Sequence, residues 1–284
     1  MSRPLAMRGT PTVARRQNCG RMHSTLVDGK RNTVDCFREA QVRLRRNAAS
    51  MAGRFLFALG VLLGVVFFGS AVWADMEAFL FDASQRADAP LTTLRCPVLI
   101  TPREVGEVRA TFENTLEWTI KPRVYFHVTD GFVSLIREDA LFLELAPGEK
   151  RQLTWQVTTD DAAWKYFILA RVYQAPAYPL PSRTSACGVL ALDVPFLTGG
   201  QLVLLTLFAL ALLLGGGFYL WYRAHRPLEG RLSQEGIGRA ALMGLIALGT
   251  VFGLVGLWLP GLICAILIVL VIVVLLARAA META

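Results

Sequence analysis

The chain has 284 residues, of which 54% are hydrophobic and only 18% are charged, and its mean hydropathy is +0.45. Soluble globular domains carry about 25% charged residues, so this composition argues against a wholly soluble protein, and it excludes a chain that is disordered throughout. Lys and Arg outnumber Asp and Glu by 29 to 22, which gives a formal net charge of +7.

Residues 1–54 form a basic arm that we expect to be cytoplasmic and largely disordered. Residues 1–50 hold eleven Lys and Arg but three Asp and Glu. Phe37, Gln41 and Leu44 share one helical face, so a short amphipathic helix on the anionic inner leaflet is an alternative to a solvated tail. Translation from Met51 is a second alternative, because the run that ends at Ala74 resembles a signal peptide with a cleavage site. We favour an uncleaved anchor, since this run is long for a signal core.

Four apolar runs predict membrane-spanning helices, because a span needs about 20 mostly apolar residues. They are residues 55–74, 202–222, 240–259 and 262–277, and none contains Asp, Glu, Lys, Arg or His. Pro260-Gly261 separates the last two, and this turn pair predicts a tight helical hairpin. Trp73 and Trp258 would mark the membrane interfaces at the ends of the first and third helices.

The charge distribution predicts the orientation in the membrane. The loop 223–239 carries four Arg and two Glu, and the tail 278–284 carries Arg278, whereas residues 75–198 hold twelve Lys and Arg against sixteen Asp and Glu. Lys and Arg favour the cytoplasmic side of short loops. We therefore expect cytoplasmic termini in a multi-pass cell-membrane protein, with residues 75–198 outside. The basic excess is then an orientation signal that predicts contact with the lipid bilayer and not with nucleic acid.

Residues 75–198 read as a β domain with seven or eight short strands. Val108, Ala110 and Phe112 alternate with polar residues, and period-two alternation is typical of a strand with one solvated face. His127 falls on the polar side of its strand and is expected at the surface. Turn pairs such as Pro147-Gly148 separate the strands, and the spacing predicts an antiparallel sandwich. The strand candidates are residues 98–101, 108–113, 124–129, 132–136, 141–145, 153–157, 166–173 and 189–194.

Two segments resemble a known type of module. The turn Leu145-Ala-Pro-Gly-Glu-Lys150 and the strand Ala110-Thr-Phe-Glu-Asn114 are similar to features of bacterial immunoglobulin-like domains of the NEW3 and CARDB type. The resemblance covers about residues 96–194. It implies an all-β immunoglobulin-like sandwich outside the membrane, next to four transmembrane helices, and it implies no catalytic residues.

Cys96 and Cys187 bracket this domain. In an oxidising compartment they are placed to form a disulfide. A redox-active or metal-binding pair is the alternative, but it has neither a CxxC spacing nor a nearby His in its support.

No catalytic or metal-binding motif is recognisable, so we expect neither enzyme activity nor a cofactor. Pairs of glycines four residues apart, Gly60 with Gly64 and Gly249 with Gly253, predict close helix packing within the bundle, with dimerisation as the alternative. Three prolines surround Tyr178 in the loop 174–183. We take Tyr178, Pro179 and Arg183 as a candidate partner contact, since stiff loops bind at low entropic cost; a rigid connector is the alternative.

These observations favour a non-enzymatic accessory or scaffold protein whose external domain binds a membrane or envelope protein or a surface ligand. The alternative is a component of a transport or channel complex in which the β domain is a receptor or gate. The spans lack the ionisable groups that transporters usually carry, which disfavours that alternative.

Overall fold

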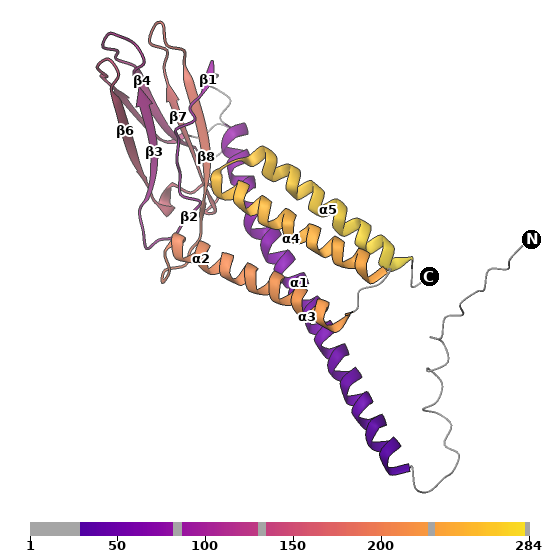
Figure 1. The fold of residues 1–284 in the computed structure, drawn as a ribbon. Helices are drawn as coiled ribbons and strands as arrows, with labels where there is room; N and C mark the ends of the chain where they lie inside the picture. Colours follow the sequence, from indigo (N-terminus) through magenta and orange to yellow (C-terminus); the bar gives the residue numbers. More distant parts are fainter. Residues whose placement is uncertain (1–28, 82–86, 130–134, 227–230, 282–284) are drawn as a thin grey trace, which may run out of the picture.

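The computed structural model of the chain describes residues 29–81, 87–129, 135–226 and 231–281. A bundle of long helices lies against a two-sheet β region, which is at one end of the bundle (Figure 1). The expectations for residues 1–28, for part of the strand candidate 132–136, for part of the loop 223–239 and for the last three residues fall outside the described ranges.

The first helix, α1, is longer than predicted at both ends, because it runs from Gly29 to Phe81. The prediction of a largely disordered arm is therefore wrong for residues 29–54, and residues 75–81 are helical rather than part of the β domain. No proline interrupts residues 29–81, and residues 29–54 are rich in Arg and Ala, which favour helix. The edge of an apolar run marks a membrane boundary, but it does not end a helix.

The second span consists of α2 (Gly199–Leu210), the π-helix η2 (Ala211–Gly216) and α3 (Gly217–Ala224). Thr198 and Gln201 form a reciprocal capping box at its start, in which the Gln201 side chain accepts a hydrogen bond from the Thr198 N–H at 3.1 Å. The π-helical turn includes Gly215 and Gly216, which have no side chains to hold the regular helix.

The last two spans are α4 (Arg231–Val255) and α5 (Trp258–Ala280). Their turn lies at Gly256 and not at the predicted Pro260-Gly261. Gly256 has a φ of +77°, the left-handed conformation that commonly ends a helix. Pro260 is in the first turn of α5, where its missing N–H costs no hydrogen bond. Trp258 therefore begins the last helix instead of ending the third.

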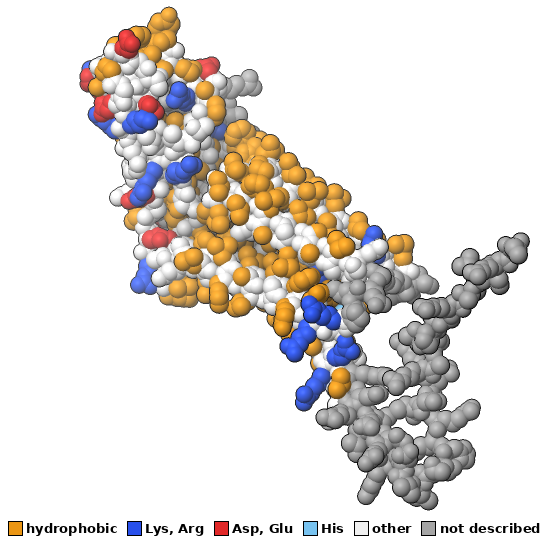
Figure 2. Space-filling view, viewed as in Figure 1, with side chains coloured by type: hydrophobic (Ala, Val, Ile, Leu, Met, Phe, Trp, Pro, Cys, Tyr) orange, Lys and Arg blue, Asp and Glu red, His pale blue; other side chains and the backbone are white. Residues whose placement is uncertain are grey.

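Within the described residues, four helical segments are long and apolar enough to cross a membrane: 44–80, 199–224, 232–255 and 258–278. Figure 2 shows hydrophobic side chains over the bundle, whereas charged side chains of both signs gather over the β region and basic ones lie at the opposite end of the bundle. This distribution is compatible with a multi-pass membrane protein.

The β region contains a six-stranded mixed sheet and a two-stranded antiparallel sheet. The larger sheet has the order β1-β8-β7-β4-β5, and β2 also pairs with β8; β3 and β6 form the smaller sheet. β1 and β2 run parallel to β8, so the prediction of a wholly antiparallel arrangement is wrong. The strands are β1 (Ala89–Pro90), β2 (Leu99–Ile100), β3 (Gly106–Glu113), β4 (Arg123–Thr129), β5 (Leu135–Phe142), β6 (Lys150–Val157), β7 (Phe167–Gln174) and β8 (Arg183–Ala191), with a 3₁₀ turn η1 at Thr159–Asp161.

One strand, β5, replaces the two candidates at 132–136 and 141–145. Its residues from Leu135 to Phe142 pair with β4, and Leu145 instead forms an isolated bridge with Ile120. The strand is exposed on both sides at most positions, so it has no clear apolar alternation that would reveal it in the sequence.

The two sheets share one hydrophobic core. Val108, Ala110 and Phe112 of β3 are buried, as their alternation predicted. The rings of Phe126 in β4 and Trp155 in β6 stack across the two sheets with centroids 5.0 Å apart, a distance typical of aromatic pairs in cores.

The two segments with the family resemblance lie against each other. The buried Asn114 amide donates to the carbonyl oxygens of Leu145 at 3.0 Å and Ala146 at 3.0 Å. The backbone N–H of Gly148, which has a φ of +71°, donates to the Asn114 carbonyl at 3.0 Å. Asn114 therefore fixes both loops, because its buried amide adds a second hydrogen bond to carbonyls that already accept the Ile120 and Glu149 N–H groups.

Candidate functional site

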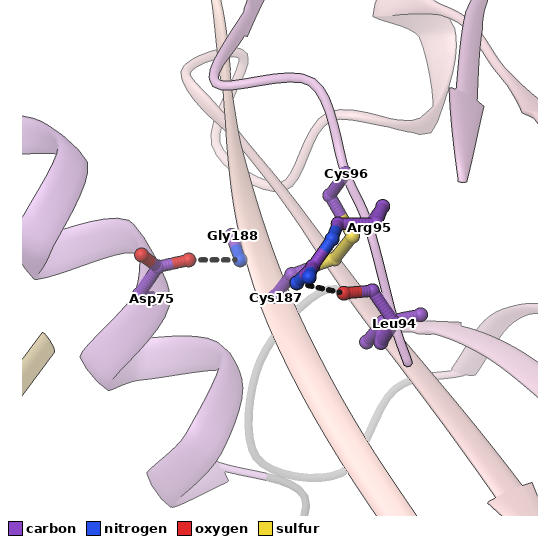
Figure 3. The surroundings of a disulfide bond; sticks show 6 residues. All are labelled: Asp75, Leu94, Arg95, Cys96, Cys187 and Gly188. Atoms are coloured by element: carbon purple, nitrogen blue, oxygen red, sulfur yellow. Dashed lines mark hydrogen bonds between the residues drawn. A yellow bond between two sulfur atoms is a disulfide. The ribbon is translucent and has the colours of Figure 1, made fainter. Parts of the chain in front are cut away.

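The end of α1 packs directly on β8, which ties the β region to the bundle. The Gly188 N–H donates to Asp75 Oδ1 at 3.0 Å (Figure 3). A Cβ atom at Gly188 would lie only 2.1 Å from the carbonyl carbon of Ala74. Only glycine allows this close approach of helix and strand, so the sequence carries a specific requirement here that its patterns did not reveal.

The expected disulfide between Cys96 and Cys187 is present beside this junction (Figure 3). It links the segment before β2 to the middle of β8, with the two Cα atoms 6.5 Å apart. Gly188 follows Cys187 directly, so β8 is held by the disulfide at one residue and by α1 at the next.

Arg171 of β7 holds the last turn of α1. Its buried guanidinium donates to the Phe79 carbonyl at 3.1 Å and to the Ala78 carbonyl at 3.5 Å. The last carbonyls of a helix lack internal donors and carry partial negative charge, so an arginine is favourable there. This contact explains why α1 continues to Phe81, beyond the end of the apolar run at residue 74.

His127, expected at the surface, is buried: only 7% of the residue is exposed to solvent. It does lie on the outer side of its strand, as the alternation predicted, but the Tyr125 ring lies 6.0 Å from it and Glu138 Oε1 lies 3.9 Å from its Nε2 atom. Tyr125 of the same strand and Glu138 of β5 therefore lie beside a residue that the local pattern assigned to solvent.

The end of the β region farthest from its junction with α2 carries large exposed side chains. Strand pairing brings three loops together there, the loops 114–122, 143–149 and 175–182. Trp118, Phe142 and Tyr178 are 54%, 73% and 96% exposed. We call these three residues together with Arg123 the distal aromatic surface.

Tyr178, a candidate partner contact predicted from the sequence, is at the tip of a closed turn. Leu180 N–H donates to the Ala177 carbonyl at 2.8 Å, and the Tyr178-Pro179 peptide bond is cis. Pro179 is thus part of the turn itself. Arg183 lies below the tip, because it is the first residue of β8 and pairs with Ala89 and Gln174.

The base of this turn is closed by Asp88. Its carboxylate accepts hydrogen bonds from the Ser182 hydroxyl at 2.6 Å and from the Ser182 N–H at 3.1 Å. The Ser182 side-chain and backbone bonds hold the pKa of Asp88 below its ordinary value of 3.8. The turn that carries Tyr178 is therefore fixed near its tip by the Ala177–Leu180 bond and at its base by the Ser182–Asp88 bonds. The Tyr178 ring itself contacts no partner in the described part of the chain.

Sequence reasoning missed Arg123, Phe142 and Trp118. The Arg123 guanidinium carbon lies 4.8 Å from the Tyr125 ring centroid and 5.5 Å from that of Phe142, within the range of cation–π attraction. Arg123 and Phe142 are neighbours only because β4 pairs with β5. The sequence offered only one sign of this surface: the aromatic Phe142 at the end of β5, a strand without clear apolar alternation.

The predicted packing glycines all lie on faces of α1 or α4 that contact other helices. A Cβ at Gly60 would be 2.9 Å from Leu214, and one at Gly64 would be 2.5 Å from Ile246. Cβ atoms at Gly249 and Gly253 would meet Phe68 at 3.0 Å and Ala71 at 3.5 Å, respectively.

Two other glycines make a closer crossing, between α1 and α3. A Cβ at Gly53 would lie 2.9 Å from the Gly217 carbonyl oxygen, and one at Gly217 would lie 2.9 Å from the Gly53 carbonyl oxygen. Backbone thus meets backbone here, which small residues permit. Neither residue has a second glycine four positions away in the sequence, so a search for glycine pairs at that spacing does not find them.

A second cluster lies at the end of the bundle opposite the β region. Trp221 is fully buried, and the Arg239 guanidinium carbon is 3.9 Å from its ring centroid. Glu235 lies 3.5 Å from Arg239, and His225 Nδ1 is 2.8 Å from the Trp221 carbonyl. These contacts join α3 to α4 and hold the charge of Arg239 against the bundle.

The described residues contain no group of three or more His, Cys, Asp or Glu that could hold a metal ion. The only two described histidines, His127 and His225, lie in the β region and at the opposite end of the bundle.

Comparisons add little to this picture. No protein-family model and no curated protein matches the chain. Among solved structures, a β-glucosidase from Listeria innocua matches with 14% identity and a TM-score of 0.25, over 34% of this chain and 15% of the glucosidase. The β-glucosidase EmGH1 from Erythrobacter marinus matches with 12% identity and a TM-score of 0.25, over 35% of this chain and 15% of its own. Likenesses this partial carry no argument about fold or activity.

Proposed function

We propose that the protein is a multi-pass membrane protein whose external immunoglobulin-like domain binds a protein partner through the distal aromatic surface, in an accessory or scaffold role. The observation that carries the proposal is Tyr178, whose side chain is 96% exposed at the tip of a hydrogen-bonded turn. A ring this exposed buries little apolar area against its own domain and so contributes little to the stability of that domain.

The strand arrangement supports an immunoglobulin-like assignment. One sheet contains the order β8-β7-β4-β5, the other contains β3 and β6, and both contribute to one core. The Asn114 contacts with the Leu145–Ala146 turn join the two segments that resemble NEW3 and CARDB domains. By analogy of fold, the loops 114–122 and 175–182 correspond to two of the loops with which antibody domains bind.

Charge and redox chemistry support an external location of this domain. The segment that contains the Cys96–Cys187 disulfide is acidic, and disulfides persist in oxidising compartments. The basic loop and tail are at the other end of the bundle (Figure 2), where Lys and Arg favour the cytoplasm.

The composition of the surface favours a protein over a small ligand. Trp, Tyr and Arg dominate the binding energy of protein interfaces, and all three types occur here. The closed turn around Tyr178 lowers the entropy that binding would cost. Small ligands prefer concave pockets, whereas these side chains project from loops and from strand ends.

The test is site-specific photo-crosslinking in native membranes, with a photoreactive phenylalanine at position 178 or 142. The matched control is position 166, because Tyr166 is a similarly large residue that is 62% exposed at the opposite end of the β region. We expect positions 178 and 142 to capture the same protein, and position 166 not to capture it. Equal capture from all three positions, or none from 178 and 142, would overturn the proposal.

The alternative role, as the receptor or gate of a transport complex, rests on the junction between α1 and β8. The contacts of Asp75, Gly188 and Arg171 fix the β region to a helix that crosses the bundle, so binding at the distal end could move α1 as a rigid lever. Solute flux through liposomes that contain the purified protein, alone and with its crosslinked partner, would distinguish this role from simple scaffolding.

A further inference from the structure

A groove between α4 and α5 lies at the end of the bundle opposite the β region. Its volume is about 390 Å³, within the range of ligand sites. Gly238 has no side chain and forms part of its floor, opposite Leu275. The remaining lining residues are Gln234, Ile237, Leu270, Val271, Val274 and Arg278.

The groove is open to the surroundings of the bundle and is apolar along most of its length. Ile237, Leu270 and Val274 are each more than half exposed, although they belong to membrane-spanning segments. From Leu270 to Arg278 the helix rises about 12 Å, which is close to the roughly 15 Å depth of one hydrocarbon leaflet. The shape and chemistry thus suit a hydrocarbon chain that lies parallel to the helices.

One end of the groove is polar and cationic. Arg278 Nη1 donates to Gln234 Oε1 at 3.3 Å, and both side chains are exposed. They lie where the predicted topology places the headgroups of the inner leaflet. An arginine binds phosphate through paired hydrogen bonds, and the Gln234 amide can donate another.

We propose that this groove binds one anionic phospholipid of the cytoplasmic leaflet, with an acyl chain along Ile237, Leu270 and Val274 and the phosphate at Arg278. The positive charge of Arg278 at the polar end of the groove favours an anionic occupant. Anionic lipids are the abundant candidates, because the cytoplasmic leaflet is rich in them. A transmembrane helix of a partner would fill the apolar part of the groove, but it would leave Arg278 without an anion.

The experiment uses the full chain in nanodiscs of phosphatidylcholine that contain a minority of phosphatidylglycerol. Native mass spectrometry after release into mild detergent counts the retained lipids. We expect one retained phosphatidylglycerol for each wild-type chain. Arg278→Gln should weaken its binding about tenfold, the effect of one charge-assisted hydrogen bond, and Val274→Trp should abolish retention of either lipid by filling the groove.

Two control variants separate this site from general lipid contact. Arg223→Gln removes an exposed basic residue at the end of α3, and Leu205→Trp enlarges an exposed side chain on α2; both should retain the lipid like the wild type. Equal losses in Arg278→Gln and Arg223→Gln, equal retention of the two phospholipids by the wild type, or capture of a protein helix by a crosslinker at position 274 would each overturn the proposal. None of these results depends on the partner of the β domain.

Discussion

The two ends of the β region both expose large aromatic side chains, but one end lies next to the helical bundle and the other does not. At the membrane-side end, where β8 leads into α2, Trp164, Tyr166 and Phe196 are between 52% and 68% exposed. Aromatic rings are common at the interface between membrane and water, so the proposed topology would place these three at such an interface. Trp118, Phe142 and Tyr178 at the distal end have no such explanation, because they lie at the other end of the strands, whereas the hydrogen bonds that join α1 to the β region reach the middle of β7 and β8.

The two ends also differ in how they are fixed. The side of the β region that faces the bundle is held by the end of α1, the disulfide and the Arg171 contacts with helix carbonyls. The distal loops are held by hydrogen bonds that the Asn114 amide donates and by those that the Asp88 carboxylate accepts from Ser182. Residues of the first group should therefore control stability, whereas the distal aromatic surface should control binding and leave stability unchanged.

The largest effect is expected from the disulfide. Replacing both Cys96 and Cys187 by Ser opens a loop with a sequence separation of 91, which should lower the free energy of unfolding by about 4.6 kcal/mol in the chain-entropy model. Unfolding of the β region, followed by near-ultraviolet circular dichroism in mild detergent, measures this change. Cys264→Ala is the control, since Cys264 is a buried free cysteine in α5, and it should leave that transition in place.

The next effect is expected at the contact between α1 and β8. Gly188→Ala would place a methyl group 2.1 Å from the Ala74 backbone, which cannot move aside as a flexible side chain can. We expect a loss of about 3 kcal/mol, at the upper end of the range for overpacking. Gly69→Ala in α1 meets no atom within 4 Å and should instead stabilise the helix slightly. If the two variants unfold at the same temperature, the close contact does not exist.

A smaller effect is expected at Asn114, which organises the distal loops. Asn114→Ala removes the side-chain hydrogen bonds to the Leu145 and Ala146 carbonyls and leaves each with only its backbone donor, so we expect a loss of about 2 kcal/mol together with weaker crosslinking from position 178. Tyr178→Ala should change stability by less than about 0.5 kcal/mol and still abolish capture of the partner. Thermal unfolding and crosslinking of the same two preparations would show whether loop order and the aromatic contact are separable.

The sequence predicts the elements of this fold better than their limits and partners. The uncharged apolar runs identify all four spans, and alternation identifies β3, β4 and β6. Charged Asp75 and Glu77 end the predicted first span, but the helix continues because Arg171, almost 100 residues later, binds its last carbonyls. The parallel pairing of β1 and β2 with β8 is equally remote in sequence, and no local pattern specifies it.

The candidate site shows the same division between local and remote information. Tyr178 was predictable because its prolines are neighbours in the sequence. Arg123 and Phe142 lie at opposite ends of two strands along the chain, and only the register of β4 on β5 makes them adjacent. The Gly188 requirement is also invisible locally, since it arises from a helix more than 100 residues away.

The smallest effect concerns pH and again separates the two ends. Hydrogen bonds from Ser182 lower the pKa of Asp88 in the folded protein. A carboxyl group with a depressed folded pKa contributes stability above its unfolded pKa of about 3.9, and that contribution is lost as the pH falls through the lower folded value. We expect the hydrogen-exchange protection of the Ser182 amide, which donates to Asp88, to fall in this acidic range.

The amide of Leu190 provides the comparison, since it donates to the Val98 carbonyl at 2.9 Å near the membrane-side end of β8 and no carboxyl group takes part in its bond. Its protection, corrected for the intrinsic pH dependence of exchange, should remain constant while that of Ser182 falls. Asp88→Asn should remove the pH dependence at Ser182 without affecting Leu190. Parallel loss at both amides would mean that acid loosens β8 as a whole, and the two ends of the β region would then not be independent.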